Sequence, residues 1–137
     1  MRSNNIIKTD EYIVDLSPVS TKTTSMERTD GKSLRSDYTV TSHVDCKDPL
    51  LSSPKVIATS SATAMLDTVY AKARFYNGDG SLVNSDETTE NNTNFASATA
   101  KSKASNIYYG DDYGYGNHLY EKEGYKTIIH ETYDTFE

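Results

Sequence analysis

The chain has 137 residues and a mass of 15.2 kDa, which is enough for one domain around a single core. Its formal net charge is −6, with four Lys and Arg against eleven Asp and Glu in residues 75–137, which excludes binding to nucleic-acid phosphates as its main activity. A single cysteine excludes a disulfide bond within the chain.

The N-terminal segment is polar apart from one short run with a period of two. Residues 12–16 alternate between two faces, and Pro18 ends the run. This pattern predicts an N-terminal arm or edge strand over residues 1–17 and a single β domain over residues 18–137. The polar residues 17–36 predict a long loop or a weak edge hairpin.

The middle of the chain has the clearest alternation. Residues 38–44 and 68–76 alternate between two faces, and each run predicts a strand. The Asn-Gly-Asp-Gly sequence at residues 77–80 is typical of a tight turn, so residues 68–84 predict a hairpin. Residues 60–76 also fit the spacing of a helix, which leaves an α+β fold with one helix there as the alternative.

The last third of the chain joins two predicted loops to two alternating runs. Residues 86–94 are acidic and rich in Asn and predict a loop, whereas the alternating alanines of residues 96–104 predict a strand. Residues 105–117 combine four tyrosines with three glycines and predict a second long loop. The alternation of residues 119–133 predicts a C-terminal hairpin.

These elements predict an all-β fold, namely a small antiparallel β-sandwich or a partly closed barrel of about six to eight short strands. Seven Ile, seven Leu, seven Val and three Phe are few for a chain of this length. We therefore expect a thin core that tyrosine and alanine side chains complete.

The sequence offers little support for catalysis. His43 and Cys46 fall on opposite faces of their predicted strand, so they would not form a nucleophile–base pair. A pair of carboxylates such as Asp111 with Glu121 or Glu131 has no spacing that distinguishes it from surface acids. We expect no catalytic residues and no enzymatic activity.

Two histidines are the remaining candidates for a zinc site. His118 and His130 would meet across the C-terminal hairpin, with Glu121 or Glu131 as a third ligand. An ordinary cross-strand pair explains the same spacing. We therefore expect no metal-binding residues of this kind.

Two acidic stretches would suit calcium better than zinc, because calcium binds carboxylate and amide oxygens on loops. The spacing of their residues does not fit an EF-hand loop. We therefore expect no cofactor, and calcium is the one ion that these stretches would accommodate. The residues concerned are Asn77, Asp79, Asp86, Glu87 and Glu90 in the first stretch and Asp111 and Asp112 in the second.

The Tyr- and Gly-rich segment is the strongest candidate for a binding surface. A tyrosine brings a large contact area and a hydroxyl group with little side-chain entropy to lose, which suits recognition. The alternative is that these rings pack over a sheet edge in place of the missing aliphatic side chains. The predicted binding residues are Tyr108, Tyr109, Asp111, Asp112, Tyr113, Tyr115 and Tyr120.

These features predict a non-enzymatic binding or self-assembling protein that is extracellular or at the cell surface. We expect it to be a mature form without its signal peptide, and a cytoplasmic chain is the alternative. The expected partner is a second copy (a homo-oligomer), another surface protein or a glycan, and not a nucleic acid. The alternative function is a secreted antibacterial or membrane-active protein, whose amphipathic strands at residues 56–66 and 94–104 would contact lipid.

Overall fold

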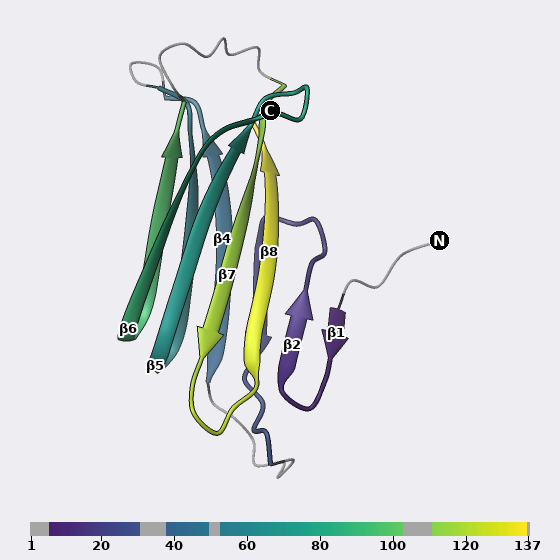
Figure 1. Ribbon diagram of the computed structural model, residues 1–137, viewed down its shortest axis with the longest axis vertical. Helices are drawn as coiled ribbons and strands as arrows, with labels where there is room; N and C mark the ends of the chain where they lie inside the picture. Colours follow the sequence, from purple (N-terminus) through teal and green to yellow (C-terminus); the bar gives the residue numbers. More distant parts are fainter. Residues whose placement is uncertain (1–5, 31–37, 50–52, 103–110, 137) are drawn as a thin grey trace.

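A computed structural model describes residues 6–30, 38–49, 53–102 and 111–136 (Figure 1). The described residues are 73% strand and contain no helix. Their eight strands are β1 (Ile6–Lys8), β2 (Tyr12–Asp15), β3 (Thr21–Ser25), β4 (Thr39–Lys47), β5 (Lys55–Tyr76), β6 (Leu82–Lys101), β7 (Tyr113–Glu121) and β8 (Thr127–Thr135).

The strands form one curled, mixed sheet with the shape of a half-barrel. Its order is β1-β2-β8-β7-β5-β4-β3, and β6 also pairs with β5. The pairing is antiparallel throughout, apart from the parallel pair β2–β8. This confirms the prediction of an all-β, partly closed fold. The predicted arm, residues 1–17, contributes β1 and β2 to one edge of the sheet.

The alternative of a helix over residues 60–76 is wrong, because these residues belong to β5, which spans 22 residues. Strands β5 and β6 are far longer than the short strands expected from the sequence. β5 is hydrogen-bonded to β6 over its length, to β4 over residues 55–62 and to β7 over residues 68–76. Hydrogen bonding to three neighbouring strands therefore favours a strand here, although the local spacing of apolar residues also fits a helix.

The long β5–β6 hairpin doubles back on itself, as Figure 1 shows at the lower end of the view. The pairing of β5 with β6 is irregular between Ser61 and Leu66. The Ser60 hydroxyl, before this bend, donates to the carbonyl of Tyr70, after it, at 2.8 Å. The two residues are ten positions apart in the same strand. The bend makes the two halves of one sheet face each other, and β4 lies against β7 and β8.

The core fills the space between these facing halves. In β5 the inward residues are Val56, Ala58 and Ser60 before the bend and Val69, Ala71, Ala73 and Phe75 after it, so the irregular segment exchanges the parity of the buried face. Small side chains allow the halves to approach closely. A Cβ atom on Gly116 would lie 2.5 Å from Thr132 Oγ1 and 2.7 Å from His118 Nε2, so this position requires glycine.

One predicted loop is wrong, and a second is wrong in its last five residues. Residues 86–94 lie within β6, and most of them are exposed on both faces, so their sequence lacks the alternation of a half-buried strand. Of the predicted loop at residues 105–117, residues 113–117 belong to β7, and residues 105–110 lie outside the described part of the chain. Gly114 and Gly116 occupy inward positions of β7.

Candidate functional site

Four tyrosines gather on the outward face of β5, β7 and β8. Tyr76 is the register partner of Tyr113, and Tyr115 is the partner of Tyr133. The Tyr76 and Tyr113 rings are stacked with centroids 5.3 Å apart, and the Tyr115 and Tyr133 centroids are 5.1 Å apart. Edge contacts of Tyr115 with Tyr76 and Tyr113 connect the two pairs. We call these four side chains the tyrosine platform.

Arg74 holds the platform from its β5 side. Its guanidinium carbon lies 4.8 Å from the centroid of the Tyr115 ring. Nη1 donates to the Tyr76 hydroxyl at 2.9 Å, and Nη2 donates to Glu131 at 2.8 Å. Ring stacking, a cation–π contact and an ion pair therefore fix the orientation of the rings before any partner arrives.

The platform keeps neutral hydroxyl groups at physiological pH. Partial burial, followed by the neighbouring Tyr and acidic side chains, raises the pKa of Tyr113 and of Tyr115 above the ordinary value for tyrosine. Each of the four tyrosines is half-buried, so part of each side chain is accessible to solvent. Such a surface can donate and accept hydrogen bonds and cover apolar groups of a partner.

The residues predicted for binding are divided between three places. Tyr113 and Tyr115 belong to the platform, whereas Asp111 and Asp112 lie just before β7, exposed and buried respectively. Tyr120 is in the core, where its hydroxyl donates to the carbonyl of Thr41, so its ring packs between the sheet halves instead of facing a partner. Tyr108 and Tyr109 lie outside the described residues.

Sequence reasoning missed three members of this surface. Arg74 and Tyr76 occupy the outward positions of the predicted strand 68–76, and Tyr133 occupies an outward position of the C-terminal hairpin. In the sequence, Arg74 and Tyr76 share the face opposite Val69, Ala71, Ala73 and Phe75, but nothing relates Tyr133 to them. What the sequence lacks is the order of the strands, which brings β5 beside β7 although about forty residues separate them.

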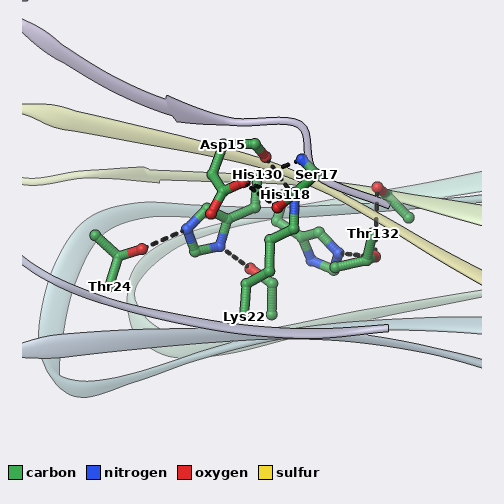
Figure 2. Close-up of polar contacts among 9 residues, drawn as sticks. Asp15, Ser17, Lys22, Thr24, His118, His130 and Thr132 are labelled. Carbon is green, nitrogen blue, oxygen red and sulfur yellow. Dashed lines mark hydrogen bonds and ion pairs between the residues drawn. The ribbon is translucent and has the colours of Figure 1, made fainter. Parts of the chain in front are cut away.

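A second polar cluster lies inside the core, around two histidines (Figure 2). His118 and His130 are register partners on β7 and β8, as predicted, and their exposed fractions are 1% and 0%. His130 Nε2 is 2.8 Å from Thr24 Oγ1, and its Nδ1 is 2.7 Å from Ser42 Oγ. His118 Nε2 is 2.8 Å from Thr132 Oγ1, and its Nδ1 is 2.8 Å from Ser60 Oγ.

The partners of these hydroxyls fix the protonated nitrogen of each ring. Tyr120 donates to a backbone carbonyl, so it accepts the proton of Ser42, which leaves Ser42 Oγ to accept from His130 Nδ1. Ser60 likewise donates to a carbonyl and accepts from His118 Nδ1. These contacts place a proton on Nδ1 of each ring. We call the two histidines with their hydroxyl partners the histidine layer.

Burial keeps these rings neutral. It lowers the pKa of His118 to about 3, helped by the charges of His130, Lys22 and His43, and it lowers the pKa of His130 to about 4. Lys22 is itself 5% exposed and donates to the backbone and carboxylate oxygens of Asp15, at 2.7 Å and 3.1 Å. The charge of Lys22 adds to the effect of burial and lowers the pKa of both rings, whereas the charge of Asp15 opposes it at His130 and raises the pKa of that ring.

The histidine layer does not resemble a metal or catalytic centre. Each ring nitrogen already faces a hydroxyl group, and Glu131 points outward to Arg74 instead of inward as a third ligand. No group of three His, Cys, Asp or Glu side chains within the described ranges is arranged to hold a metal ion. The layer is best explained as a set of matched polar contacts that hold β3, β4 and β5 against β7 and β8.

Cys46 and His43 do not meet. His43 is hydrogen-bonded to Thr21 on the outer face of β4, whereas the Cys46 thiol donates to the carbonyl of Asp134. Burial, and then the charges of Asp134 and Asp45, raises the pKa of the Cys46 thiol. The thiol therefore stays protonated and lacks the reactivity of a nucleophile.

Comparison with family models, with curated proteins and with solved structures gave no match to this chain. The described residues contain no helix that is long and apolar enough to cross a membrane. Inferences about function therefore depend on the geometry of the two clusters and of the sheet edges.

Proposed function

We propose that the protein is a non-enzymatic binding protein that acts outside the cytoplasm and recognises another protein through the tyrosine platform. The observation that supports this proposal is the clustering of four tyrosines around Arg74 on one solvent-facing side of the sheet. Tyr and Arg are enriched among the residues that dominate the binding energy of protein interfaces.

The orientation of the rings favours a protein over a glycan. Tyr76 and Tyr113 turn their ring faces toward each other, with an angle of 5° between the planes. The edges and hydroxyl groups, rather than two open ring faces, are therefore presented to a partner. The chain also lacks tryptophan, which provides the largest surface for stacking on a sugar.

The test compares the partners captured by the immobilised full-length chain and by the variant Tyr115→Ser. The matched control is Tyr12→Ser, which removes an exposed tyrosine from β2, away from the platform. A protein captured by the wild-type chain and the control should, once purified, bind Tyr115→Ser at least about tenfold more weakly. Equal affinity for all three chains would contradict the proposal, and binding to a glycan array alone would replace the protein partner by a sugar.

A second candidate function is self-assembly through β1, which the exposed residues of this edge favour. β1 pairs with β2 and with no other described strand. Its Ile7 is 55% exposed, and Leu16 and Val19 add apolar surface near the same edge. An edge strand with exposed apolar side chains is a template for pairing with a second copy.

Sedimentation velocity tests this candidate with the full chain. We expect a concentration-dependent dimer that Ile7→Lys removes, because a lysine on an edge strand opposes pairing. The control is Leu82→Lys, which changes a residue of similar exposure, 53%, at the start of β6. A wild-type chain that stays monomeric at all concentrations, or a dimer that survives Ile7→Lys, would overturn self-assembly through this edge.

The membrane-active alternative has less structural support. Three alanines of the predicted face, Ala96, Ala98 and Ala100, are packed in the core and are at most 2% exposed. Contact of this face with lipid would require the two halves of the sheet to separate. A liposome-leakage assay measures this activity directly.

A further inference from the structure

The start of the first acidic stretch lies near the second stretch at one end of the core, where β5 ends and β7 begins. Tyr76 and Tyr113 are the last register partners of these strands, so Asn77 and Asp112 are the residues immediately beyond this pair. Both continue the inward-facing positions, after Phe75 on β5 and before Gly114 on β7. In the sequence, more than thirty residues separate Asn77 from Asp112.

Asp112 is buried and its carboxylate is poorly matched. Its exposed fraction is 1%, and neither carboxylate oxygen has a well-formed hydrogen bond within the described residues. The Gly78 amide and the Asp111 carboxylate are its nearest polar neighbours. The side-chain oxygen of Asn77 is buried without a partner as well. Three oxygen atoms with unused lone pairs are thus held at one place inside the protein, where an unmatched polar group is costly.

Further negative charge surrounds this place. The Asp111 carboxylate lies over Gly78, in the space that a Cβ atom would fill. Burial first, and then the charges of Asp111 and Asp79, raises the pKa of Asp112, while the Gly78 amide lowers it. No cation from the described part of the chain is among the charges that act on Asp112.

We propose that Asn77, Asp111 and Asp112 bind a calcium ion at this end of the core. Oxygen atoms are the ligands that calcium takes, and backbone carbonyls and water complete its shell of about six to eight. Magnesium demands a stricter octahedral shell and retains most of its water, so a buried carboxylate beside a neutral amide oxygen suits calcium better. We call this group, together with Asp79, the acidic end.

A shared proton is the rival explanation of the same geometry. A neutral Asp112 could stand beside an ionised Asp111 without any metal, as paired carboxylates do elsewhere. The two explanations differ in the expected response to calcium. A calcium site binds the ion more tightly when a second negative charge faces it, whereas a shared proton predicts that added calcium changes nothing.

Terbium luminescence tests the site directly, since Tb³⁺ replaces Ca²⁺ at oxygen sites and accepts energy from nearby tyrosines. Tyr76 and Tyr113 are adjacent in the chain to Asn77 and Asp112. We expect sensitised emission from the wild-type chain that added Ca²⁺ removes and that Mg²⁺ at the same concentration leaves. Asp112→Asn keeps the shape of the side chain and should weaken Tb³⁺ binding by about a hundredfold or more, beyond the effect of losing an outer-shell partner.

The control variant is Asp10→Asn, which neutralises an exposed aspartate in the β1–β2 turn. It should bind Tb³⁺ as the wild-type chain does. Absence of sensitised emission from a folded wild-type chain, or equal Tb³⁺ affinity for Asp112→Asn and Asp10→Asn, would overturn the calcium site. Neither result affects the tyrosine platform, because partner capture is measured separately on Tyr115→Ser.

Discussion

The two histidines of the histidine layer and Asp112 of the acidic end are equally buried, yet their polar atoms have opposite surroundings. Every ring nitrogen of His118 and His130 faces a hydroxyl group within 2.8 Å. Neither carboxylate oxygen of Asp112 has a hydrogen-bond partner among the described residues. Two regions of one core thus show that burial alone does not define a site. A matched polar group stabilises the fold, and an unmatched one points to a ligand.

The two regions also differ in charge. The histidine layer stays neutral because burial lowers the pKa of both rings, and the charge of Lys22 adds to this effect. The acidic end collects carboxylates with no described cation beside Asp112. The first arrangement costs little to bury, whereas the second becomes favourable when a cation supplies the missing charge.

Removal of one histidine should give the largest effect. His130→Ala leaves a cavity and deprives Thr24 and Ser42 of their partner, so we expect the free energy of unfolding to fall by about 3–5 kcal/mol. Urea denaturation measures this change. His43→Ala is the control, because that ring is on the outer face, and its cost should be below about 1 kcal/mol. Equal losses for both variants would show that the layer adds nothing beyond an ordinary surface contact.

Acid should weaken the histidine layer next. Each ring has a pKa near 6.5 in the unfolded chain, but about 3 for His118 and about 4 for His130 in the folded chain. The unfolded state therefore takes up protons first as the pH falls below 6.5. The free energy of unfolding should decrease by up to about 1.4 kcal/mol per pH unit for each histidine, until the pH nears the folded values.

Denaturation curves at about pH 7.5 and about pH 5.5 check this dependence. The variant His43→Ala should keep the same slope, since it leaves the buried rings in place. A free energy of unfolding that stays constant over this interval would mean that the two rings are charged, or exposed to solvent, in the folded protein.

Neutralising Asp112 should raise the free energy of unfolding, in contrast to the histidine variants. Without divalent cations, Asp112→Asn removes a buried negative charge, which burial and the charge of Asp111 make unfavourable. We expect the variant to be more stable than the wild-type chain by about 1 kcal/mol in a chelating buffer. Thermal unfolding of both chains in that buffer measures the difference. A clear destabilisation would indicate that Asp112 has a partner inside the protein.

The outer face should show the smallest effect on stability. Glu131→Gln breaks the ion pair with Arg74, whose two side chains are 22% and 30% exposed. Since partly exposed ion pairs contribute little, the free energy of unfolding should change by less than about 1 kcal/mol. A larger loss in urea denaturation would mean that the tyrosine platform is part of the structural core rather than a surface prepared for a partner.

The sequence revealed much of the fold because alternation reports which residues are inward. It located the inward alanines of residues 96–100, the turn at residues 77–80 and the pairing of His118 with His130. Alternation fails where a strand is exposed on both faces, as in residues 86–94. It also fails where glycine replaces a side chain because the sheet halves approach closely, as at Gly116.

The candidate sites were harder to predict because they depend on the bend in β5. A single irregular segment between Ser61 and Leu66 folds the sheet over, and no local pattern in the sequence gives its angle. The fold then places Arg74 beside Tyr115 and pairs Tyr76 with Tyr113, the residues that adjoin Asn77 and Asp112. The residue types indicated the chemistry of the tyrosine platform and of the acidic end. Only the strand order shows which residues come together in each of them.

The contrast between matched and unmatched buried groups is tested most directly by calcium-dependent stability. Urea denaturation of the wild-type chain and of Asp112→Asn should be measured with millimolar calcium and again with a chelator. Ligand binding to the folded state alone should raise the wild-type free energy of unfolding, by about 2.7 kcal/mol at a hundred times the dissociation constant, and leave the variant unchanged. Identical wild-type curves in calcium and in chelator would contradict the account.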